Sequence, residues 1–455
     1  MGRRTVSLTE GPILSGLFQL FWPIMLGALL QQCYNTIDVA IVGNCLGKEA
    51  LAAVGGTSST MTNLMMEFLV GISSGAGVVI AQYYGAGRKR ELSQSIRTAV
   101  GIGAFLGLVL SIAGIVMAPF VLRWIHAPAE IAGMARIYLQ TYFCGLVPMS
   151  LYNTGAAVLR AVGDTKRPLY FLILCCILNL LLDLLFVAVL GWGILGAALA
   201  TVVSQSLSAL LVLRILFRSR AYFQTSAQGG GAWGRNQKRM LAIGLPSGLQ
   251  AVMYSISNMV IQSQVNTFST DVIAASSVFD RLEGFFWMMF NAYGVAVLTF
   301  MGQNYGAGEG KRMRQGIRIA LIAGVGLALL LSGLSMAGGK WFFRMFTDDG
   351  AVQEMGLSIL YFMMPWYFIY VFIEVLSGAI RSTGEAVMPM LICCFGICAV
   401  RMVWGLAVAP AFHEIRLLLL GYPVSWAVTA LLFLAYYLLG GPRERIAKAG
   451  QESGL

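Results

Sequence analysis

Two motifs occur twice in this 455-residue chain at one spacing. The segment 81–87 reads Ala-Gln-Tyr-Tyr-Gly-Ala-Gly, and the segment 302–308 reads Gly-Gln-Asn-Tyr-Gly-Ala-Gly, so the numbering of the two copies differs by a constant offset (302 − 81 = 221). The same offset separates Arg160 from Arg381 (381 − 160 = 221), and each arginine is followed by a glycine three residues later and a proline eight residues later. Two unrelated motifs at one offset indicate that the chain consists of two copies of an ancestral half.

The composition excludes a soluble protein whose surface is exposed to water. Hydrophobic residues make up 58% of the chain and charged residues only 11%, whereas a soluble domain carries about 25% charged residues. A helix needs about 20 mostly apolar residues to cross a bilayer. Twelve stretches qualify, six in each half: 14–42, 51–80, 95–125, 132–162, 168–190, 194–216, 243–268, 272–301, 316–336, 352–380, 389–408 and 415–439. The sequence therefore predicts an all-α integral membrane protein with twelve transmembrane helices, and duplicated halves are a common plan among secondary transporters.

The charges predict the domain limits and the orientation. We expect an N-lobe at 1–217, a glycine-rich charged linker at 218–240 and a C-lobe at 241–455. If the N-terminus is cytoplasmic, 23 of the 31 Lys and Arg residues lie in inward-facing segments and helix ends, against six on the outer side. The positive-inside rule then places both termini in the cytoplasm. The net charge of +11 follows from this topology, so no nucleic-acid partner is expected.

The sequence shows no group of residues typical of an enzyme active site. The glycine-containing segments lack the spacing and the Ser/Thr of a Walker A loop. Cys393, Cys394 and Cys398 have no histidine or acidic neighbours and are expected to pack as small apolar side chains, while His126 and His413 are too sparse for a metal centre. We therefore expect no enzyme, no cofactor and no metal centre; any pumping must draw on an ion gradient or a partner.

Acidic residues at bilayer depth are the first functional candidates, because a charge there costs about 2.5–3.5 kcal/mol on insertion scales. Asp183 lies in an apolar run with Asn179 one helical turn before it, so both side chains share a face. The amide and the carboxyl can hydrogen-bond each other or share a cation. The alternative is a polar pair that joins two helices.

A polar face on the first span ends at Asp38. It contains Gln31, Tyr34 and Asn35, and such a face suits a water-filled substrate cavity. The alternative is that Asp38 merely lies close to the outer end of its helix. If Asp38 lies near Asp183, the two carboxyls titrate as a coupled pair.

The seventh span carries a polar residue at every fourth position from Gln250, with Tyr254 and Asn258 next. The stripe predicts either a cavity lining or contacts between helices. Glu283 and Glu374 are further candidates for the substrate cavity.

The eighth span also contains Asp280 and Arg281 beside Glu283. For these three residues we expect an internal salt-bridge cluster, with Glu374 or Arg401 as additional partners.

Several motifs together resemble the multidrug and toxic compound extrusion family, in particular its DNA-damage-inducible branch. They are Thr36-Ile37-Asp38 with Val42-Gly43, Gln82 with Gly85-Ala86-Gly87, Arg160 with Gly163-Asp164-Thr165 and Pro168, Asn179 with Asp183, Gly196-Ala197-Ala198-Leu199-Ala200-Thr201, and Gly244-Leu245-Pro246.

The resemblance implies two six-helix lobes related by a pseudo-two-fold axis along the membrane normal. It implies a monomer in the bacterial cytoplasmic membrane, surrounded by lipid, that exports cationic amphipathic compounds in exchange for H⁺ or Na⁺. Asp38, Asn179 and Asp183 match the family's N-lobe coupling cluster and could bind Na⁺. The chain departs from some members because the seventh span has no acid, although Glu374 matches an acidic position on their tenth helix.

A flippase or exporter for a lipid-linked saccharide or another amphipathic anion is the second reading. The six acids at bilayer depth, Asp38, Glu67, Asp183, Asp280, Glu283 and Glu374, outnumber the two arginines there and favour cationic cargo.

Overall fold

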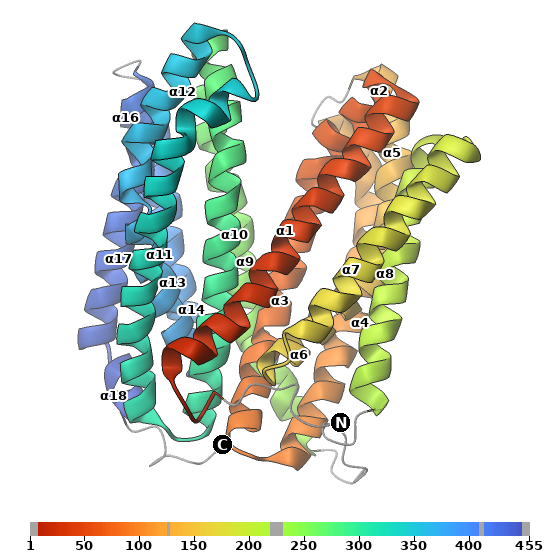
Figure 1. The fold of residues 1–455 in the computed structure, drawn as a ribbon. Coiled ribbons are helices and arrows are strands. Elements are labelled where there is room, and N and C mark those ends of the chain that lie inside the picture. The colour runs from red at the N-terminus through yellow and green to blue at the C-terminus, as the bar shows by residue number, and fades with distance from the viewer. Residues whose placement is uncertain (1–7, 125–127, 219–230, 409–413, 448–455) are drawn as a thin grey trace. The chain divides into compact units, whose positions relative to one another are not determined.

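The computed structural model describes residues 8–124, 128–218, 231–408 and 414–447, and the ordered segments in these ranges are all helical (Figure 1). Some expectations lie outside the described residues: Ile125 at the end of the third span, His126, His413 and residues 219–230 of the predicted linker. Residues 231–240, which the sequence assigns to that linker, form the first turns of a helix, α9.

Within the described residues, ten helices are long and apolar enough to cross a membrane. A helix pair bent by 44°, Gly350–Trp366 with Phe368–Arg381, makes an eleventh span. The remaining predicted span, the fourth (132–162), consists of α5 (Ala129–Cys144) and α6 (Leu146–Ala161), which Gly145 separates. Each of these has only 16 residues, less than a bilayer crossing needs. All twelve predicted spans therefore correspond to helical segments, and the fourth is divided in two.

The duplication is visible in the backbone. The bent pair in the second half breaks between Trp366 and Phe368, and Trp366 is the repeat equivalent of Gly145, where the fourth span breaks (366 − 145 = 221). The two predicted glycine turns have positive φ at equivalent positions, 67° at Gly87 and 78° at Gly308. Gly163 and Gly384, in the second repeated motif, also match, with φ of 82° and 100°. Only glycine adopts this region routinely, which explains why these positions are glycine in both halves.

The chain forms two compact units. Unit 1 contains Trp22–Gly248, and unit 2 contains the described residues of 8–21 and 249–447. The helices α1 (Ile13–Leu46) and α9 (Gly231–Val265) each cross from one unit to the other, and each contains a proline close to the crossing, Pro23 and Pro246. These units differ from the expected lobes at the start of each lobe. The first turns of α1 pack in unit 2, and the first turns of α9 pack in unit 1.

Unit 1 contains the remaining helices of the first half (Figure 1). They are α2 (Lys48–Leu51), the π-helical η1 (Ala52–Ser58), α3 (Ser59–Gly85), α4 (Lys89–Trp124), α5, α6, α7 (Lys166–Asp183), the π-helical η2 (Leu184–Val189) and α8 (Gly193–Arg218).

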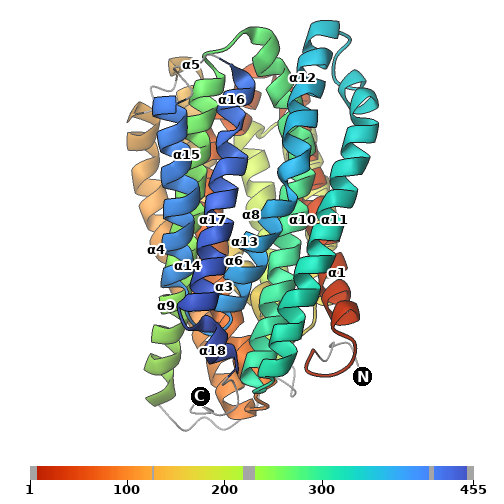
Figure 2. The ribbon, with the colours of Figure 1, turned by 90° about the vertical axis from the view of Figure 1, so that its left-hand side faces the viewer.

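Unit 2 contains the helices of the second half, and α13 and α17 run side by side within it (Figure 2). They are α10 (Thr270–Gly306), α11 (Gly310–Arg344), α12 (Gly350–Met363), the 3₁₀ turn η3 (Met364–Trp366), α13 (Phe368–Arg381), α14 (Val387–Cys393), η4 (Cys394–Ala399), α15 (Val400–Val403), η5 (Trp404–Val408), α16 (Ile415–Leu419), α17 (Gly421–Leu439) and α18 (Pro442–Ala447).

Two glycine pairs hold the start of α9 in unit 1. A Cβ added to Gly71 of α3 would lie 2.4 Å from the Cα of Gly248, and one added to Gly75 would lie 2.5 Å from the backbone nitrogen of Gly244. Each pair has a spacing of four residues, so each lies on one face of its helix. The absence of side chains lets the two backbones touch, as at close helix crossings in membranes.

A polar cluster fixes the same segment at the end of α3. Arg239 donates to Oε1 of Gln82 at 2.7 Å and to the hydroxyl of Tyr83 at 3.0 Å. The Tyr83 hydroxyl in turn donates to Oδ1 of Asn236 at 3.1 Å, and Gln82, Tyr83 and Asn236 are buried. In the first half, Gln82 and Tyr83 of the repeated motif therefore anchor the first turns of the seventh span.

In unit 2 the corresponding position anchors the beginning of the chain. Asn304 and Arg312 both donate to the carbonyl of Leu8, at 3.1 Å and 3.0 Å. A Cβ on Gly310 would collide with the carbonyl of Ile446 in α18. Both described chain ends thus lie at the α10–α11 turn, in agreement with the expectation that the termini share one side of the membrane.

Candidate functional site

Asp38, Asn179 and Asp183 lie together in unit 1. The carboxyls of Asp38 on α1 and Asp183 on α7 are hydrogen-bonded to each other. The surrounding network orients the Asn179 amide: its Nδ2 donates to Oδ2 of Asp183 at 2.7 Å, and its Oδ1 accepts from the Thr201 amide at 3.2 Å. Asp38 is 8% exposed, and Asn179 and Asp183 are almost completely buried. Asp38 therefore lies next to Asp183, which is the condition under which the two carboxyls titrate as a coupled pair.

Apolar and aromatic side chains enclose the cluster. Buried Tyr138 of α5 lies close enough to interact electrostatically with both carboxyls, and its ring stacks on Tyr142 at 5.9 Å. Half-buried Tyr34 places its hydroxyl 3.4 Å from the hydroxyl of Thr201 on α8. The helices α5 and α8 therefore contribute side chains around a carboxyl pair that joins α1 to α7.

The local sequence explains where Asp183 points. The α-helical part of the fifth span ends at Asp183, and the wider π-helical turns of η2 follow. Phe186 in η2 stacks on Trp192 at 4.9 Å, and Gly196 leaves the space that Phe186 occupies. Such π segments often mark functional sites because they change the direction of side chains within one helix.

This arrangement suits a small cation. Two carboxyls can hydrogen-bond only if one of them carries a proton. Oδ1 of Asp38 and Oδ1 of Asp183 are both buried and have no hydrogen-bond donor among the described residues. Unsatisfied buried acceptors are costly, and a proton or a Na⁺ ion would satisfy them.

The other predicted cavity residues of unit 1 differ in their exposure. Gln31 and Asn35 are exposed, and Tyr34 is turned toward Thr201. The sequence interpretation named Thr201 only as part of a family motif and did not assign it or Tyr138 to the site. Thr201 follows four small residues in the α8 segment 196–200 and could have been found as a polar group on that helix.

The polar stripe of the seventh span makes contacts along its own helix and with one neighbour. Gln250 donates to the hydroxyl of Tyr254 at 3.4 Å. Asn258 accepts from Nη1 of Arg401 at 2.7 Å. Asn258 therefore connects α9 to α15, which agrees with the interpretation of the stripe as contacts between helices.

The expected salt-bridge cluster of the second half is wrong. Among the described residues, ion pairs within 4.0 Å join Arg167 to Asp164 and Arg445 to Glu385, and none involves Arg281 or Arg401. Arg281 is exposed, with its guanidinium 6.0 Å from the ring centroid of Phe346.

The two glutamates of unit 2 are held by tyrosines. Glu283 accepts a hydrogen bond from the Tyr367 hydroxyl. Glu374 hydrogen-bonds Tyr370 and occupies the space left by Gly294. Tyrosine hydroxyls thus bind both Glu283 and Glu374, and the rings of Tyr367 and Tyr370 belong to one aromatic cluster around Trp426.

Asp280 and Glu283 line a small polar cavity in unit 2. Gln262, Ser276 and Tyr422 complete its polar lining, and it has room for one or two water-sized spheres, about 20 Å³. Ser276 Oγ is buried and has no partner within the described part of the chain. Neither Ser276 nor Tyr422 stands out in the sequence, since both occur within apolar runs.

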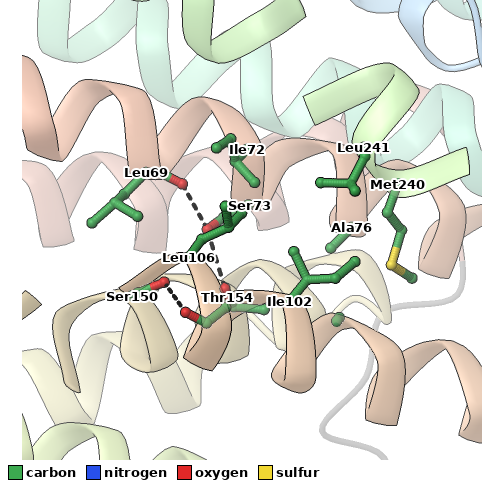
Figure 3. Close-up of a pocket in the computed structure, with 12 residues that line it drawn as sticks. Leu69, Ile72, Ser73, Ala76, Ile102, Leu106, Ser150, Thr154, Met240 and Leu241 are labelled. Atoms are coloured by element: carbon green, nitrogen blue, oxygen red, sulfur yellow. Dashed lines mark hydrogen bonds between the residues drawn. The ribbon is translucent and has the colours of Figure 1, made fainter. Parts of the chain in front are cut away.

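A second cavity lies in unit 1 between α3, α4, α6 and the start of α9 (Figure 3). Hydroxyl groups of Ser73, Ser150 and Thr154 lie at its wall, and Ser73 and Thr154 are 3.3 Å apart. Its volume of about 10 Å³ fits a single water and is far below the few hundred Å³ of a drug site.

A duplicated bundle of membrane-spanning helices with a buried carboxyl pair defines a class, the secondary membrane transporters. Comparison with known proteins narrows this class. The MatE family model matches residues 23–185 and 246–406, so each half matches it separately and each match begins at one of the crossing prolines.

Relatives of known name agree with this assignment. The chain is 27% identical over 441 residues to the probable multidrug resistance protein YoeA of Bacillus subtilis, covering 94% of each chain. It is 24% identical over 420 residues to the probable multidrug resistance protein NorM of Thermotoga maritima, covering 90% of this chain and 87% of the other.

Solved structures share the fold. A multidrug resistance MATE family transporter in an outward-facing conformation superposes with a TM-score of 0.87 at 22% identity, covering 99% of this chain and all of the other. A MOP superfamily transporter from Pyrococcus furiosus gives the same TM-score at 21% identity and covers 99% of each chain.

The chain belongs to the MatE family of multidrug and toxic compound extrusion transporters. It is a multi-pass protein of the cytoplasmic membrane, with small molecules as its class of cargo.

Proposed function

We propose that this protein exports amphipathic organic cations in exchange for H⁺ or Na⁺, with Asp38, Asn179 and Asp183 as the ion site. The observation that supports the proposal is the hydrogen-bonded carboxyl pair in apolar surroundings, with one open acceptor oxygen on each acid. Val400 and Trp404 are the repeat equivalents of Asn179 and Asp183 (400 − 179 = 404 − 183 = 221). The second half therefore has neither the amide nor the carboxyl at these two positions.

The ion changes the contact between two helices. With an ion bound, at least one negative charge is neutralised, and the carboxyls can hold α1 against α7. When the ion leaves, two carboxylates at hydrogen-bonding distance repel each other strongly in a medium of low dielectric constant. The helix α1 responds at Pro23, where the proline lacks the amide that would close the helical hydrogen bond.

Substrate export follows from the movement of α1. The polar side chains Gln31, Tyr34 and Asn35 lie on this helix one to two turns before Asp38. We propose that they bind substrate in unit 1, and that ion binding to Asp38 displaces the substrate from them. In unit 2 the proposed substrate contacts are Gln250, Tyr254, Asn258, Glu283 and Glu374. The coupling ion is H⁺ or Na⁺, and the protein works as a monomer.

The test uses purified protein in liposomes. Uptake of a fluorescent organic cation is followed under an imposed proton gradient and, separately, under a sodium gradient. Asp183→Asn and Asp38→Asn should reduce gradient-driven uptake to the level of empty liposomes. Asp348→Asn makes the same chemical change at an exposed position and should leave uptake unchanged. Full transport by Asp183→Asn would disprove the proposed ion site.

An anionic amphiphile is the second candidate cargo. One relative, 25% identical over 323 residues, is an FAD transporter of Shewanella oneidensis, and a buried arginine, Arg401, lies in unit 2. If the wild-type protein takes up no organic cation under either gradient but moves a fluorescent anionic amphiphile, this second function replaces the first.

A further inference from the structure

The small cavity of unit 2 has three oxygen-bearing side chains of α10 on one wall. Ser276, Asp280 and Glu283 are spaced so that all three lie on one face of the helix (280 − 276 = 4, 283 − 280 = 3). Ser276 is 6% exposed, and its Oγ has no hydrogen-bond partner within the described residues. A buried hydroxyl without a partner is costly, and a ligand of the right size in the cavity would satisfy it.

Neighbouring helices supply further oxygens. Gln262 of α9 lines the cavity, and its Nε2 donates to Oδ1 of Asn266 at 3.2 Å, so its Oε1 remains as an acceptor. Tyr422 of α17 lines the cavity as well and can contribute its hydroxyl oxygen. The carboxyl of Glu283 is oriented by the Tyr367 hydroxyl, which donates to Oε1. The polar lining therefore consists of carboxyl, hydroxyl and amide groups, which are ligands for a hard cation.

The size of the cavity selects a small monovalent ion. Its volume of about 20 Å³ holds one or two water-sized spheres, so a Na⁺ ion fits with at most one water and an organic cation does not. Mg²⁺ keeps several waters, and Ca²⁺ takes about six to eight oxygen ligands, which is more than this lining supplies. The part of the chain that the structure describes contains no group of three or more His, Cys, Asp or Glu side chains that could hold a metal ion, which argues against a transition metal.

A monovalent cation needs one ionised carboxyl and not two. Asp280 is exposed, so the cavity is open on its side and an ion can enter there. A proton competes with the ion for this carboxyl. Arg401 acts electrostatically on Glu283 but does not line the cavity. Its positive charge opposes cation binding, and it opposes a divalent ion more than a monovalent one.

The internal repeat relates this cavity to the ion cluster of unit 1 at one position. Tyr422 is the repeat equivalent of Thr201, which lies in that cluster (422 − 201 = 221). The acids differ, because the positions equivalent to the two acids of the cavity are Ser59 and Thr62 (280 − 59 = 283 − 62 = 221). Each unit therefore has a carboxyl pair near this position, but the two pairs come from different spans.

We propose that this cavity is a second cation site, in which Ser276, Asp280 and Glu283 bind one Na⁺ ion with Gln262 and Tyr422 as additional ligands. The site goes beyond the proposed function, which assigns the coupling ion to unit 1 alone. Glu283 is also a proposed substrate contact, so an ion in this cavity and a cationic substrate would compete for its carboxyl.

The test measures equilibrium binding of radioactive sodium to the purified protein, in an alkaline buffer in which protons compete least. Asp183→Asn removes the unit 1 site and is the background for all further variants. This background should still bind a single Na⁺ ion. Adding Asp280→Asn should abolish saturable binding, because it removes the charge that is accessible to the ion. Adding Ser276→Ala should raise the Kd about fivefold, as expected for the loss of one neutral ligand.

Two substitutions on the same helix are matched controls. Asp271→Asn makes the same charge change at an exposed position outside the cavity lining. Ser277→Ala removes an exposed hydroxyl that donates to the carbonyl of Ile273 at 2.9 Å. Both should bind Na⁺ as the background does. Thermal unfolding shows which variants are folded. If Asp280→Asn does not fold, the comparison of Ser276→Ala with Ser277→Ala decides.

The outcomes separate this inference from the proposed function. Absence of saturable Na⁺ binding in Asp183→Asn overturns the second site, whereas gradient-driven transport by the wild-type protein would still support the proposed function. Binding that neither Asp280→Asn nor Ser276→Ala changes also overturns the second site, because the ion then lies elsewhere. If the wild-type protein transports nothing but Asp183→Asn binds Na⁺ through Asp280, the proposed function fails and the second site stands.

Discussion

Nδ2 of Asn179 lies 2.7 Å from Oδ2 of Asp183, one turn apart on α7. The same carboxyl reaches Asp38 on α1, so the amide fixes the acid that connects the two helices. A buried carboxyl with a fixed orientation can hold an ion in one geometry, and the loss of that orientation should affect ion coupling before it affects the fold.

We expect Asn179→Ala to weaken ion-driven uptake and to lower the free energy of unfolding by about 1–3 kcal/mol, because it leaves a buried acceptor on Asp183 without its donor. Liposome uptake and thermal unfolding in detergent measure the two effects. Asn153→Ala is the control, since Asn153 donates to the carbonyl of Met149 on its own helix at 2.9 Å. Equal losses of uptake in both variants would argue against a special role of Asn179.

The glycine crossing of α3 and α9 predicts strong sensitivity to a single methyl group. Gly75→Ala should destabilise the protein by about 1–3 kcal/mol, because the new Cβ would lie 2.4 Å from the carbonyl of Met240. Gly77→Ala, two residues away, would meet its nearest atom at 3.8 Å and should be neutral or slightly stabilising. Thermal unfolding of both variants checks this. A Gly75→Ala protein as stable as Gly77→Ala would refute the close crossing.

The hydrogen bonds that hold the start of α9 against α3 predict that removing the Tyr83 hydroxyl destabilises the protein. Tyr83→Phe removes the acceptor of Arg239 and the donor of Asn236, so we expect a loss of about 1–3 kcal/mol in the free energy of unfolding. Tyr84→Phe, at the neighbouring half-buried position, is the matched control, because none of the hydrogen bonds described between the end of α3 and α9 uses the Tyr84 hydroxyl. The expectation fails if thermal unfolding ranks the two variants equally.

The repeat predicts equal costs at equivalent glycines. Gly163→Ala and Gly384→Ala both place a Cβ at positive φ, 82° and 100°, and each should cost about 1–2 kcal/mol. Gly133→Ala on α5, where an added Cβ meets nothing within 4 Å, is the control and should not destabilise. If neither Gly163→Ala nor Gly384→Ala lowers the unfolding temperature, these turns do not need glycine.

Much of the fold could be predicted from periodicity and composition alone. The membrane spans follow from apolar length, because a backbone in lipid must satisfy its own hydrogen bonds in a helix. The duplication follows from the two repeated motifs, and the family match to each half confirms it. The break of the fourth span at Gly145 could not be predicted, because the apolar run continues through it.

The candidate ion site was predictable in part. Asp183 and Asn179 share a helix face by their spacing, so the sequence places them together without further information. Their approach to Asp38, which lies four spans earlier in the chain, depends on how α1 packs against α7 and α8. The predicted salt bridges of the second half failed for the same reason: Arg401 meets Tyr422 and Asn258, whereas Glu283 meets Tyr367.

The sequence by itself determined the membrane class, the duplication, the sidedness expected from the basic residues and the one-turn pair Asn179–Asp183. These depend on local composition and spacing, which need no knowledge of distant contacts. The tertiary structure decided which helix halves belong to which unit, which carboxyls hydrogen-bond each other and which tyrosines bind the buried glutamates. These depend on packing between segments far apart in the chain, where single groups such as the Gly71–Gly248 contact decide how closely two helices approach.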